Sequence, residues 1–263
     1  MRSLKRVQDK NGFGVRRSPI TELRGYKSAK VTRHYPRGFT LFDEGQRLEG
    51  VYLLCEGRAK VSVTSSEGKT FLVSVAGPGD LLGVDAILMG IPSGATVETL
   101  EPCRMEFLQA FDLRKMLERD RKACLAVAMD LGEKLKGVMG QARLLLLAQS
   151  ATEKLARLLV GWCDDNGHGS AEVLKMQVGL THEEIAQMIC SSRETVTRLL
   201  GEFRRKEILQ FTRDGIVVRN RKALEMLAGC GNSPVGSSCD GHHSQYICRS
   251  VECRTIGGHP GEI

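Results

Sequence analysis

Two arginines and one glutamate stand at helical spacing in residues 191–200, where their side chains could read the edges of base pairs. Arg193 and Glu194 precede Arg198 by no more than about one and a half helical turns. A guanidinium can donate two hydrogen bonds to one guanine, and a carboxylate can accept from the amino group of cytosine. The pattern therefore indicates side chains able to distinguish G·C pairs in the major groove of DNA.

The elements that must position these side chains are predicted to be two short helices joined by a tight turn. Thr181 with Glu184, and Ser191 with Glu194, have the S/T-x-x-E spacing of a capping box, which begins a helix. Apolar residues then recur on one face of each helix, at Ile185, Ala186, Ile189, Val196, Leu199, Leu200 and Phe203. This is helix-turn-helix spacing, with the second helix at residues 192–203. An ordinary pair of surface helices with solvated charges is the alternative.

A β-hairpin is predicted directly after the second helix. Apolar residues alternate over residues 207–211 and 216–218, and Asp214-Gly215 is a favoured hairpin turn. The hairpin would form a wing beside the second helix. Arg213 at its tip would either contact a phosphate or be solvated.

The run LTHEEIAQMICSSRETVTRLL, residues 180–200, resembles the DNA-binding domain of the CRP/FNR transcriptional regulators, and the resemblance extends over roughly residues 30–222. It implies an α+β fold, with an N-terminal antiparallel, jelly-roll-like β-roll, a long dimerisation helix and a C-terminal winged helix-turn-helix. It also implies a homodimer without catalytic activity or cofactor. Its partners would be RNA polymerase and double-stranded DNA carrying a palindromic, TGTGA-like operator.

The resemblance also assigns roles to individual residues. It implies base-reading side chains at Arg193, Glu194 and Arg198, and phosphate contacts at Thr181, Ser192 and Thr195. Cys190 departs from the pattern because it stands where glycine is usual, so this turn should be either strained or differently shaped. His182 replaces a basic residue, which weakens the expected phosphate contact.

Short apolar strands separated by glycine turns run from about residue 32 to 107 and predict a sandwich or barrel. Gly45, Gly57, Gly68, Gly79, Asp80 and Gly83 match the β-roll of cyclic-nucleotide-binding domains. The matching effector pocket would be lined by Gly83, Val84, Asp85, Gly94 and Ala95.

That pocket departs from the pattern of nucleotide binders. Val84 stands where a glutamate would hold the ribose, and Gly94 and Ala95 stand where Arg and Ser would hold the cyclic phosphate. No Lys or Arg occurs between Lys69 and Arg104. Because a buried phosphate requires a fixed cation and donors, we expect that this domain does not bind cAMP in the usual way, and the effector is unknown. A regulator that still binds nucleotide is one alternative.

Residues 112–148 contain no proline and are predicted to form one long helix. Small and apolar residues recur at coiled-coil spacing at Leu125, Ala128, Gly132, Leu135, Met139, Ala142 and Leu146. A second seam, beginning at Cys124 and Val127, fits almost as well. One seam would pack on the β-roll and the other on a second copy; a helix buried within one chain is the alternative.

Length and composition predict two domains in 263 residues. The net charge of +7 comes mostly from the N-terminus, since residues 1–37 carry net +9 and the rest −2. Residues 1–30 are expected to be a basic, disordered arm, followed by a sensor domain at 31–111, the helix at 112–148 and the winged domain at 149–222. We find no apolar run typical of a signal peptide or membrane span, so a cytoplasmic location is expected.

The nine cysteines fall into two groups. Five are scattered among apolar residues and are expected to be buried: Cys55, Cys103, Cys124, Cys163 and Cys190. The other four lie in a Gly/Ser-rich tail at 229–263, at Cys230, Cys239, Cys248 and Cys253. Without a C-x-x-C pair the metal signal is weak, and a disordered tail is expected.

Two further functions stay open at the level of the sequence. A redox- or metal-sensing regulator would use the four cysteines of the tail and would hold a bound metal. An interaction scaffold would keep the helix-turn-helix only as a vestige and would give no footprint on DNA.

Overall fold

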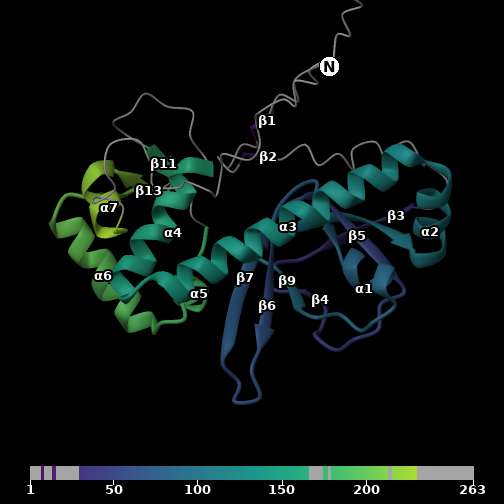
Figure 1. The fold of residues 1–263 in the computed structure, drawn as a ribbon, viewed down its shortest axis with the longest axis horizontal. Helices are drawn as coiled ribbons and strands as arrows, with labels where there is room; N and C mark the ends of the chain where they lie inside the picture. Colours follow the sequence, from purple (N-terminus) through teal and green to yellow (C-terminus); the bar gives the residue numbers. More distant parts are fainter. Residues whose placement is uncertain are drawn as a thin grey trace, which may run out of the picture.

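The computed structural model describes residues 7–8, 14–15, 30–165, 174–176, 179–212 and 215–229. A β-roll and a mainly helical C-terminal unit lie at the two ends of one long helix, α3, which runs along both (Figure 1). This is the expected α+β architecture. Within the described ranges, no helix has the length and apolar character needed to cross a membrane.

The roll consists of two four-stranded antiparallel sheets that enclose an apolar core. The first sheet has the order β3 (Lys30–Tyr35), β10 (Cys103–Gln109), β5 (Gly50–Glu56), β8 (Leu81–Leu82). The second has the order β4 (Thr40–Phe42), β9 (Thr96–Thr99), β6 (Ala59–Thr64), β7 (Thr70–Ala76). A separate two-stranded pair, β1 (Val7–Gln8) and β2 (Gly14–Val15), lies in the N-terminal arm.

Side chains alternate along β5, as a strand between two apolar layers requires. Leu54 packs inside the roll. Val51 and Leu53 face the other way and pack with α1 (Val84–Met89) and the helices that follow the roll. After β5 the chain crosses to the second sheet at Gly57, whose φ is 87°. A Cβ at Gly57 would lie 2.6 Å from the sulfur of Cys103, so only glycine fits this crossing.

The helix predicted at 112–148 is two helices in the structure, and that prediction is corrected. α2 (Ala110–Arg119) ends at Asp120, whose backbone is extended, and α3 (Arg121–Leu147) begins there. The carboxylate of Asp120 accepts hydrogen bonds from Lys122 N at 2.8 Å and Ala123 N at 3.3 Å. This N-cap allows a new helix to begin at Asp120 although neither proline nor glycine marks a break there.

The C-terminal unit combines four helices with a three-stranded sheet among the described residues. The helices are α4 (Ala151–Asp165), α5 (His182–Met188), α6 (Arg193–Arg205) and α7 (Arg221–Leu227). The sheet has the order β11 (Leu174–Met176), β13 (Gly215–Val218), β12 (Leu209–Thr212). Every apolar position predicted on the inner faces of α5 and α6 is buried.

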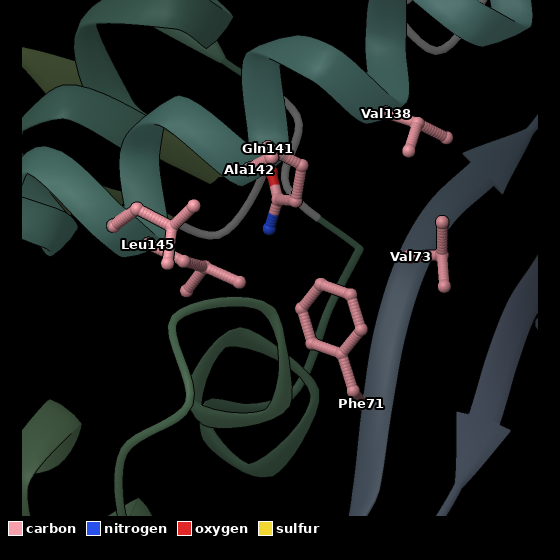
Figure 2. Close-up of a pocket in the computed structure, with 7 residues that line it drawn as sticks. Phe71, Val73, Val138, Gln141, Ala142 and Leu145 are labelled. Carbon is pink, nitrogen blue, oxygen red and sulfur yellow. The ribbon is translucent and has the colours of Figure 1, made fainter.

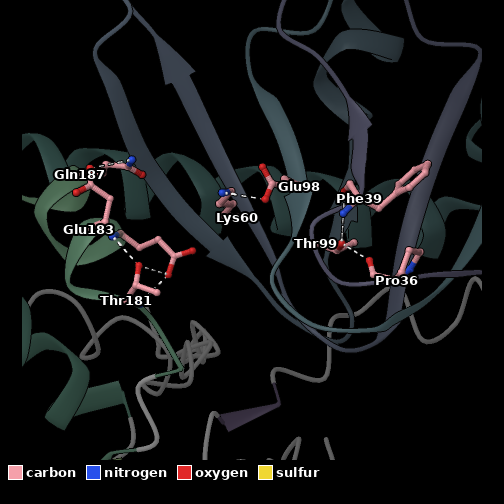
Figure 3. A network of polar contacts seen from close by, with 9 residues as sticks. Pro36, Phe39, Lys60, Glu98, Thr99, Thr181, Glu183 and Gln187 are labelled. Atoms are coloured by element: carbon pink, nitrogen blue, oxygen red, sulfur yellow. Dashed lines mark hydrogen bonds and ion pairs between the residues drawn. The ribbon is translucent and has the colours of Figure 1, made fainter.

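The C-terminal unit rests directly on the roll. Helix α5 contacts β7, and Leu72 of β7 is fully buried in the same apolar cluster as Ile185. Figure 3 shows α5, with Glu183 and Gln187, beside the sheet that carries Lys60 and Glu98. Arg58 packs against the backbone of Gly179, two residues before Thr181, the N-cap of α5. Leu72 of the sensor is therefore part of the core of the helix-turn-helix unit.

Candidate nucleic-acid interface

Helix α5 begins with the predicted capping box. The Thr181 backbone N–H donates to the carboxylate of Glu184 at 2.7 Å, and the Glu184 backbone N–H donates to the Thr181 hydroxyl at 3.2 Å (Figure 3). Two of the backbone donors at this helix start are thus satisfied reciprocally. Thr181, one of the predicted phosphate contacts, is held at an exposed helix start.

The turn between α5 and α6 keeps its usual shape although it lacks glycine. Cys190 has a φ of 50°, in the left-handed region, and the next residue, Ser191, donates its N–H to the carbonyl of Ala186 at 3.0 Å. This bond and the left-handed residue are the marks of a Schellman ending. Of the two alternatives for Cys190, the strained one is therefore correct.

Helix α6 begins one residue later than predicted. Its N-cap is Ser192 rather than Ser191, and the Ser192 hydroxyl accepts from the backbone N–H of Thr195 at 3.2 Å. The predicted phosphate contacts Ser192 and Thr195 thus lie together, with their hydroxyl oxygens 3.1 Å apart. Glu194 lies in the first turn, where hydrogen bonds to backbone N–H and to Ser192 lower the pKa of its carboxyl. The lower pKa keeps this side chain, which is expected to accept from cytosine, ionised to a lower pH than usual.

The outer face of α6 is exposed at each predicted base-reading residue. Arg193, Glu194 and Arg198 are all accessible, while Val196 and Leu199 on the opposite face are buried. Arg198 forms an ion pair with Glu202 at 2.6 Å, one turn further along α6. An exposed pair of this type contributes little free energy, so it is a weak competitor for a guanine.

His182 has a partner that the sequence did not indicate. Its Nδ1 lies 2.9 Å from the hydroxyl of Thr197, which ties the start of α5 to the exposed face of α6. The distance to Thr197 is set by the packing of α5 on α6, so no sequence spacing could have predicted it.

The predicted wing is present as β12 and β13, which pair antiparallel with Leu209 opposite Val218. A third strand, β11, joins the sheet through Leu174, which pairs with the same residue. Glu207, predicted as part of a strand, instead lies in a left-handed turn with φ of 55°. Arg213 and Asp214 at the tip lie outside the described residues.

At the position where the ribose acceptor of the expected effector pocket would stand, the structure has an apolar core residue. Val84 is fully buried in an apolar cluster with Leu53 and Leu81. Gly83, at φ 77°, approaches Leu48 so closely that a Cβ would lie 2.6 Å from it. Asp85 is exposed on the first turn of α1.

The loop at residues 91–95 is held by hydrogen bonds of Ser93. Ser93 is buried; its hydroxyl donates to the carbonyl of Ala95 at 2.7 Å and lies 3.3 Å from the Ala95 N–H. The backbone of Ser93 also exchanges hydrogen bonds with the turn at Gly45 and Gln46. Gly94 is exposed. The Ser93 hydroxyl and the backbone N–H groups of Ser93 and Ala95 therefore already have hydrogen-bond partners.

Both units of the chain match known protein families. A family model described as a cyclic nucleotide-binding domain matches residues 32–120, and one described as a Crp-like helix-turn-helix domain matches residues 153–227. The chain is similar to the CRP-like cAMP-activated global transcriptional regulator of Mycobacterium tuberculosis, with 23% identity over 72% of this chain and 84% of that protein. It is also similar to the global nitrogen regulator of Synechococcus elongatus, with 29% identity over 79% of this chain and 95% of that protein.

The chain belongs to the CRP/FNR family of transcriptional regulators. The structure of FixK2 from Bradyrhizobium japonicum has the same fold, with a TM-score of 0.65 at 21% identity over 75% of this chain and 96% of that one. Proteins of the CRP/FNR family bind DNA, are generally dimers and are not enzymes.

Two polar contacts that join α3 to the rest of this regulator were not predicted. Lys134 of α3 pairs with the buried carboxylate of Asp130 at 2.7 Å and donates to the carbonyl of Leu81, just before the expected pocket. Gln141, also buried, donates from its amide nitrogen to the carbonyl of Met188 at 2.5 Å, and its side chain can be followed in Figure 2. The only sequence signal for either contact was a polar residue standing among apolar ones in the predicted helix.

The cysteines of the described residues divide differently from the prediction. Cys55, Cys103 and Cys163 are buried, but Cys124 and Cys190 are exposed, which corrects the expectation for those two. Burial, reinforced by the nearby Glu101 carboxylate, raises the pKa of Cys103 to about 11. No group of three or more potential metal ligands occurs in the part of the chain that the structure describes. The candidate ligands Cys230, Cys239, Cys248 and Cys253 lie outside it.

Proposed function

We propose that the chain is a sequence-specific regulator that binds a palindromic operator as a homodimer. Arg193, Glu194 and Arg198 read base edges, and the DNA backbone is held by hydroxyls at Thr181, Ser192 and Thr195. The observation that carries this proposal is the exposed face of α6, whose N-terminal turn is capped and whose opposite face is fully buried. A helix fixed in this way presents its first turns to the major groove without further ordering.

The outward face of α3 supports the homodimer. Leu125, Leu135, Met139 and Leu146 of the first seam are between 58% and 81% exposed in the single chain. Ala123, Ala126 and Val127 on the opposite side are buried against the roll. The first seam thus leaves an apolar stripe that a second copy would cover. A two-fold dimer would present two α6 helices about one turn of DNA apart, which requires a palindromic site.

The effector of this proposed regulator is a compound other than cAMP. Val84, a buried apolar residue, stands where an acceptor for the ribose would be needed. In the loop that would hold the phosphate, the Ser93 hydroxyl donates to the carbonyl of Ala95 instead. No Lys or Arg lies between Lys69 and Arg104 to balance a cyclic phosphate.

The DNA-reading role is tested with Arg193→Ala in gel-shift titrations on a TGTGA-like palindrome and its single base-pair variants. Loss of one bidentate contact to guanine should remove about 1–3 kcal/mol of discrimination at one G·C pair in each half-site. Binding that depends on salt should persist because the phosphate contacts are intact. Arg119→Ala, which removes the same charge from the end of α2, is the control and should bind as the parent does. An unchanged base preference in Arg193→Ala would refute the assignment.

The effector proposal is tested by titrating cAMP into the purified protein in a calorimeter. We expect no binding at micromolar concentrations, because neither a cation nor a ribose acceptor is available at the pocket. Micromolar affinity would contradict the proposal. Substituting Val84→Glu alone should not create binding, since the phosphate would still lack a partner.

A further inference from the structure

Glu202 lies one helical turn after Arg198, on the face of α6 that carries this predicted base-reading residue. The Nη1 atom of Arg198 donates to the carboxylate of Glu202 at 2.6 Å. The Arg198 side chain is 62% exposed, whereas the Glu202 side chain is 29% exposed. Glu202 is therefore the more buried member of the pair, and the guanidinium is the member that extends into solvent.

Helix spacing alone does not select Arg198 as the partner of Glu202. Lys206 stands four residues after Glu202, and a glutamate followed by a cation at this spacing is the more favourable order for an ion pair on a helix. The structure instead joins Glu202 to Arg198, in the reverse order. An exposed pair in this order stabilises α6 little, so its main effect is on the direction in which Arg198 points.

The hydrogen bond to Glu202 leaves one bidentate edge of the Arg198 guanidinium unused. A guanidinium presents five N–H donors in a planar fork, and Nε with Nη2 forms one edge that can engage two acceptors at once. Glu202 accepts from Nη1. The Nε and Nη2 donors can therefore meet the N7 and O6 atoms of a guanine while Glu202 keeps its bond.

The surroundings of this pair leave room for a base pair. Gly201, between the two residues in the sequence, is exposed, and the position of a Cβ there is open space. The opposite face of α6 is buried at Val196, Leu199, Leu200 and Phe203. This burial fixes the backbone from which both side chains project. A guanidinium that is already held in place loses less rotamer freedom when it meets a base.

We propose that Glu202 is a positioning residue for base reading, which holds Arg198 so that its Nε–Nη2 edge meets a guanine in the major groove. This inference rests on the proposed DNA-reading function and extends it, because it assigns part of the base discrimination to a side chain that touches no base. The carboxylate also repels the phosphate backbone. An Arg198 that finds no guanine is thereby held back from nearby phosphates, and binding to unrelated DNA stays weak.

The inference is tested in gel-shift titrations of the full-length protein on a TGTGA-like palindrome and its single base-pair variants. Glu202→Ala should lower discrimination at the G·C pair read by Arg198 by about fivefold in each half-site, because the guanidinium loses its orientation. It should also bind an unrelated duplex about twofold more tightly, since one negative charge has left the interface. Glu202→Gln keeps an acceptor for Nη1 and should retain most of the discrimination.

Glu225→Ala is the matched control. Glu225 forms an ion pair with Arg221 at 2.7 Å, also at a spacing of four residues, on helix α7 of the same unit. This variant loses the same charge and the same type of helix pair, but its base preference should equal that of the parent. Circular dichroism should show that both alanine variants stay folded.

Arg198→Ala decides whether the two residues act together. In that background, adding Glu202→Ala should cause no further loss at the same base pair, because Glu202 acts through Arg198. A further loss of the same size would overturn the inference. A gain in discrimination in Glu202→Ala alone would also overturn it, because Glu202 would then be a competitor that blocks the arginine.

The same titrations separate this inference from the function on which it rests. If Arg198→Ala loses discrimination and Glu202→Ala does not, the positioning role is wrong and the DNA-reading function stands. If Arg198→Ala leaves the base preference unchanged, the reading role of Arg198 and the positioning role of Glu202 are both wrong.

Discussion

Cys190 shows how one residue retains a backbone shape that its side chain disfavours. Its φ of 50° is left-handed, a conformation that costs a residue with a Cβ about 1–2 kcal/mol. Packing of Ile185 and Ile189 below the turn and the bond from Ser191 to Ala186 hold it there.

Cys190→Gly should therefore stabilise the protein by about 0.5–1 kcal/mol, because relief of strain exceeds the extra entropy of glycine in the unfolded chain. Urea denaturation with a shared slope measures the change. Cys190→Ala retains the left-handed backbone strain and should not raise the free energy of unfolding. If both variants stabilised the protein equally, the source of the cost would be the thiol side chain rather than the backbone.

At the scale of the element, the start of α3 depends on one carboxylate. The sequence over 112–148 has no break that periodicity can detect, yet the chain turns at Asp120 because this side chain satisfies two N–H groups of α3. The turn lets α2 lie at one end of the roll while α3 runs along the roll to the C-terminal unit (Figure 1).

Asp120→Ala should lower the free energy of unfolding by about 1 kcal/mol, the usual effect of losing an N-cap. Asp120→Asn preserves an acceptor at the same position and should retain most of this stability. Thermal unfolding followed by circular dichroism compares the two. If Asn were as destabilising as Ala, charge rather than capping would explain the role of Asp120.

At the scale of the whole molecule, the roll and the helix-turn-helix form one packed body through β7, α3 and α5. Leu72 and Leu144, from outside the winged unit, are buried in its core. Gln141 adds a directional contact to this apolar interface by donating to the carbonyl of Met188.

Gln141→Leu should destabilise the protein by about 1–3 kcal/mol, since the carbonyl of Met188 would lose its donor in a buried place. Differential scanning calorimetry should also show a broader transition, because the two units would unfold less cooperatively. Gln149→Leu, an exposed change just beyond α3, is the control and should have little effect. An unchanged transition in Gln141→Leu would mean that the apolar contacts alone join the units.

Local pattern was sufficient for the elements that carry the candidate site. The capping box at Thr181, the buried faces of α5 and α6, and the hairpin of the wing depend on residues within a few positions of one another, and the structure contains all three. The lack of a phosphate cation between Lys69 and Arg104 was likewise evident from composition. The start of α6 was misplaced by one residue, because Ser191 and Ser192 are equally good caps and only the geometry of the preceding turn chooses between them.

The sequence by itself thus determined the exposed polar face of α6 and the lack of a cation at the expected effector pocket, since both follow from residue types at short, fixed spacing. Tertiary structure alone decided which seam of α3 stays exposed, that His182 meets Thr197, and that Gln141 reaches Met188. These contacts join residues up to 47 positions apart. Their distances are set by how α3, β7 and α5 pack on one another, and no periodicity along the chain encodes that packing.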